Sequence, residues 1–214
     1  MPSKSLLITE LLLLFVALPA AFRLLPVRLS PLPALWLAAL YCGYVLRRSA
    51  VTVNLWNAPP LAHSLPGVLA LFAVAAVAIT LAVYLLRPQQ LFGFVRTNPA
   101  FWAVVMVLYP VLSVYPQGII YRAFFFERYR QLFPTVPAIV VASAAVFAFS
   151  HIIFRSSWSV ALTFVAGMLF AWRYQATGSL LVSSLEHALY GCYMFTVGLG
   201  GLFYHGANRA AIGR

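Results

Sequence analysis

Four ionisable side chains stand in apolar parts of the sequence: Arg122, His151, Glu186 and His187. A charge at membrane depth costs about 2.5–3.5 kcal/mol on insertion scales, so an ionisable group there is a candidate for function. Histidine can transfer a proton near neutral pH, and its alternative role is that of a hydrogen-bonded core residue. Arg122 has no acid within four residues, so something else must compensate its charge.

The spacing around the two histidines predicts which helix faces they occupy. In the segment FAFSH, Phe147 and His151 are four residues apart, so the ring and the imidazole share one face of a helix. Around the second histidine, small and polar side chains form one stripe, and Glu186 points about 100° away from it. The stripe comprises Ser183, Ser184, His187, Tyr190 and Gly191. Such a stripe is typical of a helix that lines a water-filled cavity, and also of close helix packing.

Glu186 is the expected partner of Arg122, because it is an acid at membrane depth with no cation nearby in the sequence. If the two form a pair, removing either charge should destabilise the protein equally, and removing both should cost little more. Glu127, backbone carbonyls and a lipid phosphate are the alternative partners. Glu127 follows Phe126 near an expected helix end, where it meets solvent and neighbouring arginines.

The composition places these residues in a membrane. Of the 214 residues, 64% are hydrophobic and 8% are charged, and the mean hydropathy is +0.94. These values lie far outside the soluble range, and the length allows at most about eight passes. The net charge of +11 comes from basic residues scattered between apolar runs, which indicates contact with anionic lipids and not with nucleic acid. Cys42 and Cys192 lie in apolar segments and are interpreted as small buried hydrophobic residues.

The elements that must position the four side chains are membrane-spanning helices. Apolar runs predict about seven of them, at residues 6–22, 32–46, 67–86, 100–115, 136–154, 158–174 and 179–203. The first could instead be a signal peptide, but Glu10 in its apolar core favours a retained helix. Pro110 and Pro116 should kink or break the fourth. The short links after it make the last three spans antiparallel neighbours, so the expected fold is an all-α polytopic transmembrane bundle.

Three short motifs follow one another along the second half of the chain. They read QGIIYR from Gln117 to Arg122, FAFSH from Phe147 to His151, and HALYG from His187 to Gly191. In order and approximate spacing they resemble the motifs EExxxR, FxxxH and HxxxN of the CAAX prenyl protease and bacteriocin-processing (CPBP) family of glutamic-type intramembrane proteases. A TGSL turn before the third motif strengthens the resemblance, which covers residues 100–203. It implies a division into N-terminal helices at 1–99, a protease-like core at 100–203 and a tail at 204–214.

The resemblance also implies a mechanism. In the family, a glutamate and two histidines activate a water that attacks a peptide bond, and an asparagine assists the oxyanion, which would place His151 and His187 at a water site. Here Gln117 and Gly118 replace both motif glutamates, and Gly191 replaces the asparagine. Gln117 can hold a water but cannot accept its proton. Gly118 stands where the family has the natural helical partner of the arginine, four residues earlier.

Two functions stay open from the sequence. One is an intramembrane peptidase acting on membrane-embedded or lipidated proteins, with His151, His187, Gln117, Arg122 and Glu186 as its candidate catalytic residues. The other is a degenerate relative that binds a membrane segment without cutting it, as a scaffold. No cofactor is expected, and a metal site is disfavoured because the ligands for a zinc protease are too few. The expected location is a multi-pass position in a membrane, most simply the bacterial cytoplasmic membrane.

Overall fold

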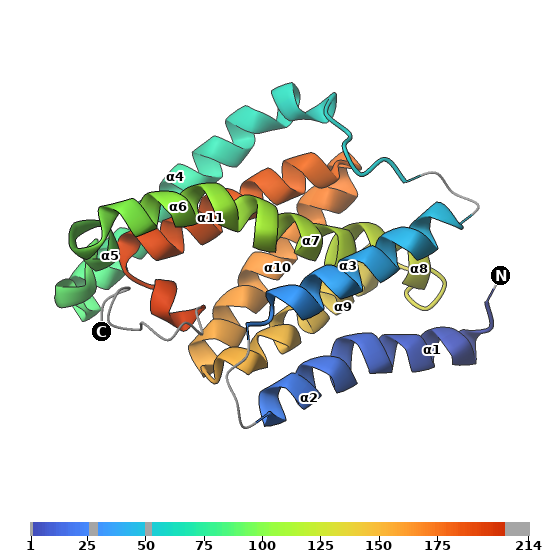
Figure 1. Ribbon diagram of the computed structural model, residues 1–214. Helices are drawn as coiled ribbons and strands as arrows, with labels where there is room; N and C mark the ends of the chain where they lie inside the picture. The colour runs from blue at the N-terminus through green and yellow to red at the C-terminus, as the bar shows by residue number, and fades with distance from the viewer. Residues whose placement is uncertain (1, 26–29, 50–52, 204–214) are drawn as a thin grey trace.

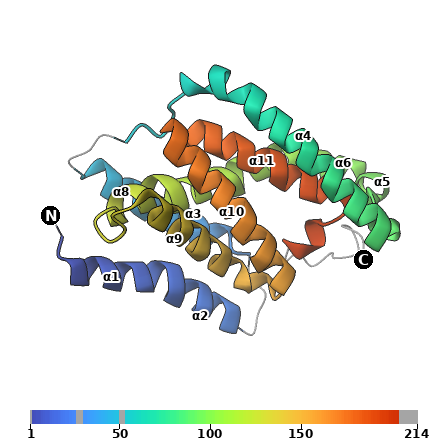
Figure 2. The ribbon, with the colours of Figure 1, turned by 180° about the vertical axis from the view of Figure 1, so that it is seen from behind.

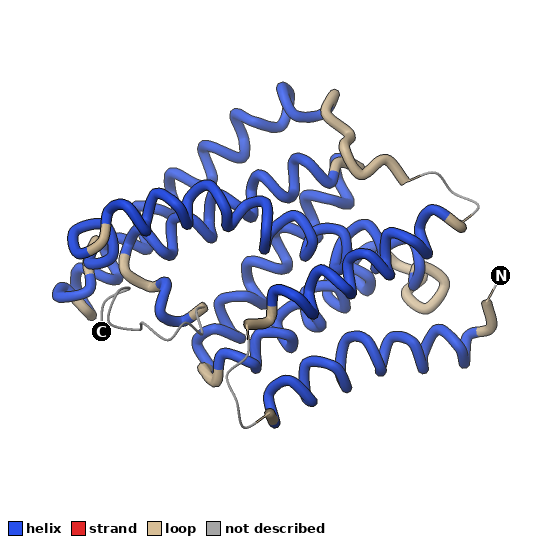
Figure 3. The backbone as a smooth tube through the Cα atoms, viewed as in Figure 1, coloured by secondary structure: helices blue, strands red, loops and turns tan. Residues whose placement is uncertain are grey.

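The computed structural model describes residues 2–25, 30–49 and 53–203, and within these ranges the regular structure is entirely helical (Figure 1; Figure 3). The α-helices are α1 (Lys4–Leu12), α2 (Leu18–Leu24), α3 (Leu32–Arg47), α4 (Pro60–Leu86), α5 (Gly93–Thr97), α6 (Pro99–Tyr109), α7 (Tyr115–Gly118), α8 (Phe125–Tyr129), α9 (Val136–Ser150), α10 (Ser157–Thr177) and α11 (Leu180–Val197). Wider π-helical turns are η1 (Leu13–Ala17), η3 (Pro110–Val114) and η4 (Ile119–Phe124). Short 3₁₀ turns are η2 (Pro88–Gln90), η5 (His151–Phe154) and η6 (Gly200–Leu202). The expected tail at 204–214 and His205 lie outside the described residues.

All seven expected segments contain a helix, which confirms the all-α bundle. Four helical stretches are long and apolar enough to cross a membrane: Lys4–Leu24, Pro60–Leu86, Pro99–Tyr129 and Val136–Phe154. Helix α3 is apolar but shorter. The last expected span ends early, at Val197, because Gly198 takes a left-handed φ of 108° and leaves the helix.

The two prolines were expected to kink or break the helix, and the structure shows a local distortion without a break. The chain stays helical for 31 residues from Pro99 to Tyr129. A proline lacks the N–H that would close a normal helical turn, and the ladder widens into π turns instead of ending. Arg122 lies in the second of these wide turns, η4. The helix that carries the first motif is therefore continuous but locally unwound.

The last three long helices form antiparallel neighbours, as their short links predict. Side-chain oxygens cap the helix starts, since Thr135 accepts from the Ala138 amide, Ser156 from Ser159 and Ser179 from Val182. Gly178, with a φ of 60°, ends α10 in a left-handed turn. As a result α10 packs against both α9 and α11 (Figure 2). This arrangement places the second and third motifs on helices that share a neighbour.

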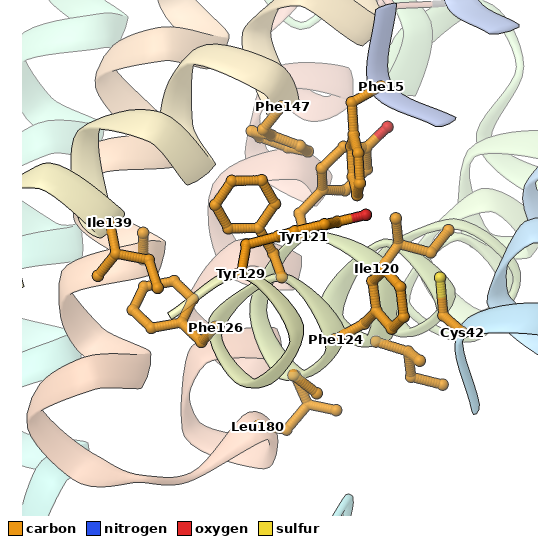
Figure 4. Close-up of a cluster of buried hydrophobic side chains, with 14 of the residues drawn as sticks. Phe15, Cys42, Ile120, Tyr121, Phe124, Phe126, Tyr129, Ile139, Phe147 and Leu180 are labelled. Atoms are coloured by element: carbon orange, nitrogen blue, oxygen red, sulfur yellow. The ribbon is translucent and has the colours of Figure 1, made fainter. Parts of the chain in front are cut away.

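A large aromatic cluster forms the centre of the bundle (Figure 4). The segment that follows Arg122 is buried on all sides, which explains why it is apolar around its whole circumference. Phe15 of the first helix meets Tyr121, Phe125 and Tyr129 with ring centroids 5.4–5.9 Å apart in edge-to-face geometry. The first expected helix is therefore packed into the core of the bundle.

An ion pair also fastens the first helix to the bundle. The carboxylate of Glu10 on α1 accepts from Arg128 Nε at 2.8 Å and Nη2 at 3.3 Å. The Tyr41 hydroxyl on α3 donates to the same carboxylate at 2.6 Å. Glu10, the residue that argued against a signal peptide in the sequence, thus has Arg128 and Tyr41 as partners in the structure.

Removing the Glu10 charge should loosen this attachment. We expect Glu10→Gln to lower the free energy of unfolding by about 2 kcal/mol, because charge-assisted bonds from Arg128 are lost. Thermal unfolding in detergent micelles measures the effect. Arg130→Gln is the matched control, since Arg130 is exposed in the same segment. Equal losses in both variants would contradict the attachment.

Candidate functional site

Arg122 is buried without an acidic partner. Its side chain is 2% exposed, and its guanidinium carbon lies 4.5 Å from the ring centroid of Phe147 and 5.3 Å from that of Phe170. Each such cation–π contact contributes about 0.5–2 kcal/mol in a desolvated setting. Both terminal nitrogens, Nη1 and Nη2, lack a protein hydrogen-bond partner within the described residues. Two aromatic faces therefore take the place of the expected carboxylate.

The predicted pair between Arg122 and Glu186 is wrong. Glu186, which is fully buried on α11, forms a two-pronged ion pair with Arg173 of α10. Arg173 Nε lies 2.8 Å from Oε2 and Nη2 lies 3.0 Å from Oε1. Arg173 precedes the Gly178 turn by five residues and Glu186 follows it by eight, and the antiparallel hairpin brings the two side chains together. An acid and a base on either side of a short turn was the sequence signal that could have revealed Arg173.

A cavity of about 150 Å³ lies beside the first two motifs. Side chains from α1–α2, α3, the η3–α7 helix and the α9–η5 boundary line it, so the first helix forms one of its walls. Most of the lining is apolar. The polar groups that reach it are Tyr109, Ser113, Gln117, Tyr121, Ser150 and His151. Two of the five candidate catalytic residues, Gln117 and His151, thus share one cavity.

The hydrogen bonding of His151 defines its protonation. Nδ1 lies 2.8 Å from the carbonyl oxygen of Phe147, four residues earlier. A carbonyl oxygen can only accept, so Nδ1 carries a hydrogen, and in the neutral imidazole Nε2 is then the acceptor nitrogen. The imidazole also lies against the Phe147 ring, with centroids 4.8 Å apart. These two contacts fix the orientation of the His151 ring.

Gln117 presents a second acceptor. Its Nε2 donates to Ser113 Oγ at 2.8 Å, and this bond turns the amide so that Oε1 has no hydrogen-bond partner among the described side chains. A buried amide oxygen without a partner is unfavourable unless water or a ligand donates to it. A water molecule has two hydrogens to donate. Gln117 and His151 both line the same cavity, and Gln117 Oε1 is buried there without a protein donor among the described residues.

His187 lies one aromatic layer away from this cavity and is not among its lining residues. Its ring stacks on Phe170 at 4.6 Å with an interplanar angle of 23°, and meets the edges of Phe147 at 5.5 Å and Tyr109 at 6.4 Å. Its Nδ1 is buried without a partner in the described part of the chain. Both histidines thus contact Phe147, but only His151 faces the cavity.

Neighbouring side chains fill the space of the lost motif residues. A Cβ atom at Gly118 would lie 2.7 Å from Ser184 Oγ and 3.0 Å from Leu180 Cδ1. A Cβ atom at Gly191 would lie 2.7 Å from Cζ of Tyr109 and closer still to its hydroxyl. The motif positions have therefore been repacked, and Tyr109 brings a hydroxyl to the place next to Gly191. Sequence reasoning missed Tyr109 and Phe170 because both lie outside the three motifs and were read as ordinary apolar helix.

No three His, Cys, Asp or Glu side chains gather closely enough for a metal ion within residues 2–25, 30–49 and 53–203.

The fold and this cavity define the class: a multi-pass helical membrane protein whose buried polar groups meet where helices of the bundle converge. Residues 98–193 match the family model described as type II CAAX prenyl endopeptidase Rce1-like. This match, over residues 98–193, confirms the resemblance seen in the motifs. No curated protein matches the chain, and no solved structure matches it.

The stability of charge-removing variants tests whether Glu186 pairs with Arg173. We expect Glu186→Gln and Arg173→Gln each to lower the free energy of unfolding by about 3 kcal/mol, because each leaves a partner charge unpaired. The double variant should cost little more than either single one.

Arg122→Gln supplies the comparison. Its loss should add to that of Glu186→Gln, because the two side chains are not partners. Urea or thermal unfolding in micelles measures the wild type, the three single variants and two double variants, Glu186→Gln with Arg173→Gln and Glu186→Gln with Arg122→Gln. Additive losses for Glu186 and Arg173, together with non-additive losses for Glu186 and Arg122, would restore the pairing expected from the sequence.

Proposed function

We propose that this protein is an intramembrane endopeptidase that hydrolyses a peptide bond of a membrane-embedded or prenylated substrate, with His151 as the general base. The observation that carries the proposal is that His151 and Gln117 line one cavity, where His151 uses Nδ1 for the Phe147 carbonyl and Gln117 Oε1 has no protein donor among the described residues. The match to the CAAX protease family supports the same reaction class.

The two acceptors suit a water nucleophile. A water that donates one hydrogen to His151 Nε2 and the other to Gln117 Oε1 directs its lone pairs away from both. As the oxygen bonds to the substrate carbonyl carbon, its proton passes to Nε2. The imidazolium then returns that proton to the departing amide nitrogen as the C–N bond breaks. Gln117 orients the water, and the histidine alone exchanges the proton.

Tyr109 is the donor for the carbonyl oxygen, on which negative charge develops. Of the other hydroxyls on the cavity lining, Ser113 Oγ accepts from Gln117 Nε2, Ser150 Oγ donates to the Phe147 carbonyl, and Tyr121 lies beside Ser150. The Tyr109 hydroxyl lies next to Gly191. Gly191 has no side chain, so the Tyr109 phenol takes the place of the asparagine that the family motif has at this position and supplies the hydrogen bond.

The remaining candidate residues do not contact the reacting atoms. Arg122 and His187 both contact Phe147, the ring against which His151 rests, and so they position the base. Glu186 holds α11 to α10 through Arg173. We therefore assign a positioning role to these three and direct contact with the water to His151 and Gln117.

A second function follows from the repacked motif positions. Ser184 and Tyr109 occupy the room that the motif side chains would need, and neither is a carboxylate. A chain of this kind could bind a membrane segment in the cavity without hydrolysing it, as a scaffold. Binding and cleavage distinguish the two functions.

The test uses the full chain in proteoliposomes with a library of membrane-anchored and prenylated peptides. We expect cleavage by the wild type, a loss of about 100-fold or more in His151→Ala, and a loss of at least about tenfold in Tyr109→Phe. Tyr84→Phe, an exposed tyrosine on α4, is the control and should cleave normally. Peptide retained by the wild type without any product would establish the scaffold instead.

Restoring the motif acids should raise the activity, provided that the packing allows it. Gln117→Glu should increase cleavage about tenfold or more, because a carboxylate accepts a proton that an amide cannot. Gly118→Glu alone should destabilise the protein, since its Cβ would meet Ser184 Oγ at 2.7 Å. Adding Ser184→Gly should relieve that clash.

Product formation and thermal unfolding are measured on the same preparations. An unchanged cleavage rate in a correctly folded Gln117→Glu variant would remove Gln117 from the water site.

A further inference from the structure

A second cavity, of about 760 Å³, lies away from the His151 site. Its walls come from the end of α4, the start of α10 and the end of α11, three segments that meet at one end of the bundle (Figure 2). This volume is within the range of about 300–1,000 Å³ that small-molecule sites occupy.

The cavity combines an apolar wall with a cationic rim. Ile79, Val83 and Leu162 are among the apolar residues of its wall, whereas Arg87 and Arg155 lie at the rim. Arg87 directly follows the membrane-spanning α4, and Arg155 directly follows the span that ends at Phe154. Both arginines are exposed. Cations at the ends of two membrane-spanning helices stand at the level of lipid head groups.

The depth of the wall suits a lipid. Ile79 precedes Arg87 by about two helical turns, which corresponds to about 12 Å along the axis of α4. Apolar lining thus continues from the rim into the depth where acyl chains lie. Trp158 also lines the cavity and is 65% exposed, as expected for an aromatic residue at the membrane–water interface.

No acidic side chain of this protein is placed to neutralise the rim. The sequence contains three acidic residues. Glu10 and Glu186 are paired with Arg128 and Arg173. Glu127 lies on α8, at the opposite end of the bundle from the α4–α5 connection (Figure 1). The rim therefore offers two cations to an anion that is not one of these carboxylates.

We propose that this cavity binds one anionic phospholipid, with the phosphate between Arg87 and Arg155 and an acyl chain along α4 and α10. Arg155 Nη2 donates to the carbonyl oxygen of Arg23 at 3.2 Å, so the same side chain joins the end of the first helix to the rim. That helix also forms a wall of the His151 cavity. A lipid phosphate at Arg155 consequently contacts the side chain that holds the end of the first helix.

The experiment titrates the purified full chain with phosphatidylglycerol and with phosphatidylcholine of identical acyl chains, and native mass spectrometry counts the bound lipid. We expect one phosphatidylglycerol to bind preferentially. Arg87→Gln with Arg155→Gln should weaken its affinity about thirtyfold, because two cations near the head group are lost. Ala82→Phe should weaken it as well, since Ala82 lines the wall and is exposed.

Arg47→Gln with Arg48→Gln is the matched control, because this exposed pair ends α3 away from the cavity. The control should bind phosphatidylglycerol as the wild type does. The proposal is overturned if both lipids bind equally, if both arginine pairs have the same effect, or if Ala82→Phe binds normally. Competition by millimolar inorganic phosphate that removes the lipid preference would show an adventitious anion site and would also overturn it.

Discussion

The guanidinium of Arg122, buried between the rings of Phe147 and Phe170, is the interaction around which the rest of the site is arranged. It stabilises a charge at membrane depth without an acid, through the negative faces of two aromatic rings. Phe147 is thereby fixed, and it in turn contacts both histidines. A shift of the Phe147 ring would expose the Arg122 charge to hydrocarbon. The orientation of His151 therefore depends on Arg122, which does not line the cavity.

The loss of motif side chains has been matched by changes in their surroundings. Ser184 fills the space at Gly118, and Tyr109 fills the space at Gly191. Protein interiors are close-packed, so two such deletions would otherwise leave costly voids. The replacements are polar hydroxyls at both places. The site has therefore kept hydrogen-bonding capacity while losing carboxylates, which is compatible with chemistry in which a histidine carries the proton.

The scarcity of acids organises the charges of the whole bundle. Two of the three acids hold helices together, Glu10 through Arg128 and Glu186 through Arg173. Within residues 2–25, 30–49 and 53–203, Arg128 and Arg173 are the arginines that form ion pairs, and Arg47, Arg87 and Arg155 stand at helix ends. Anionic lipid is the natural source of the missing negative charge. The first helix is bonded at two places. Glu10 pairs with Arg128 in the core, and the Arg23 carbonyl accepts from Arg155 at the rim of the larger cavity.

The sequence alone determined the membrane class, the approximate positions of the helices and the resemblance to the CAAX protease family, because hydropathy, turn residues and motif order are local properties of the chain. The motifs also pointed to His151 and Gln117, although the two residues lie on different helices. The tertiary structure alone decided which charges pair, since Glu186 meets Arg173 across a hairpin and Arg122 meets aromatic faces. It also revealed Tyr109 at Gly191. Partners of this kind depend on distances between helices, and a linear pattern does not contain those distances.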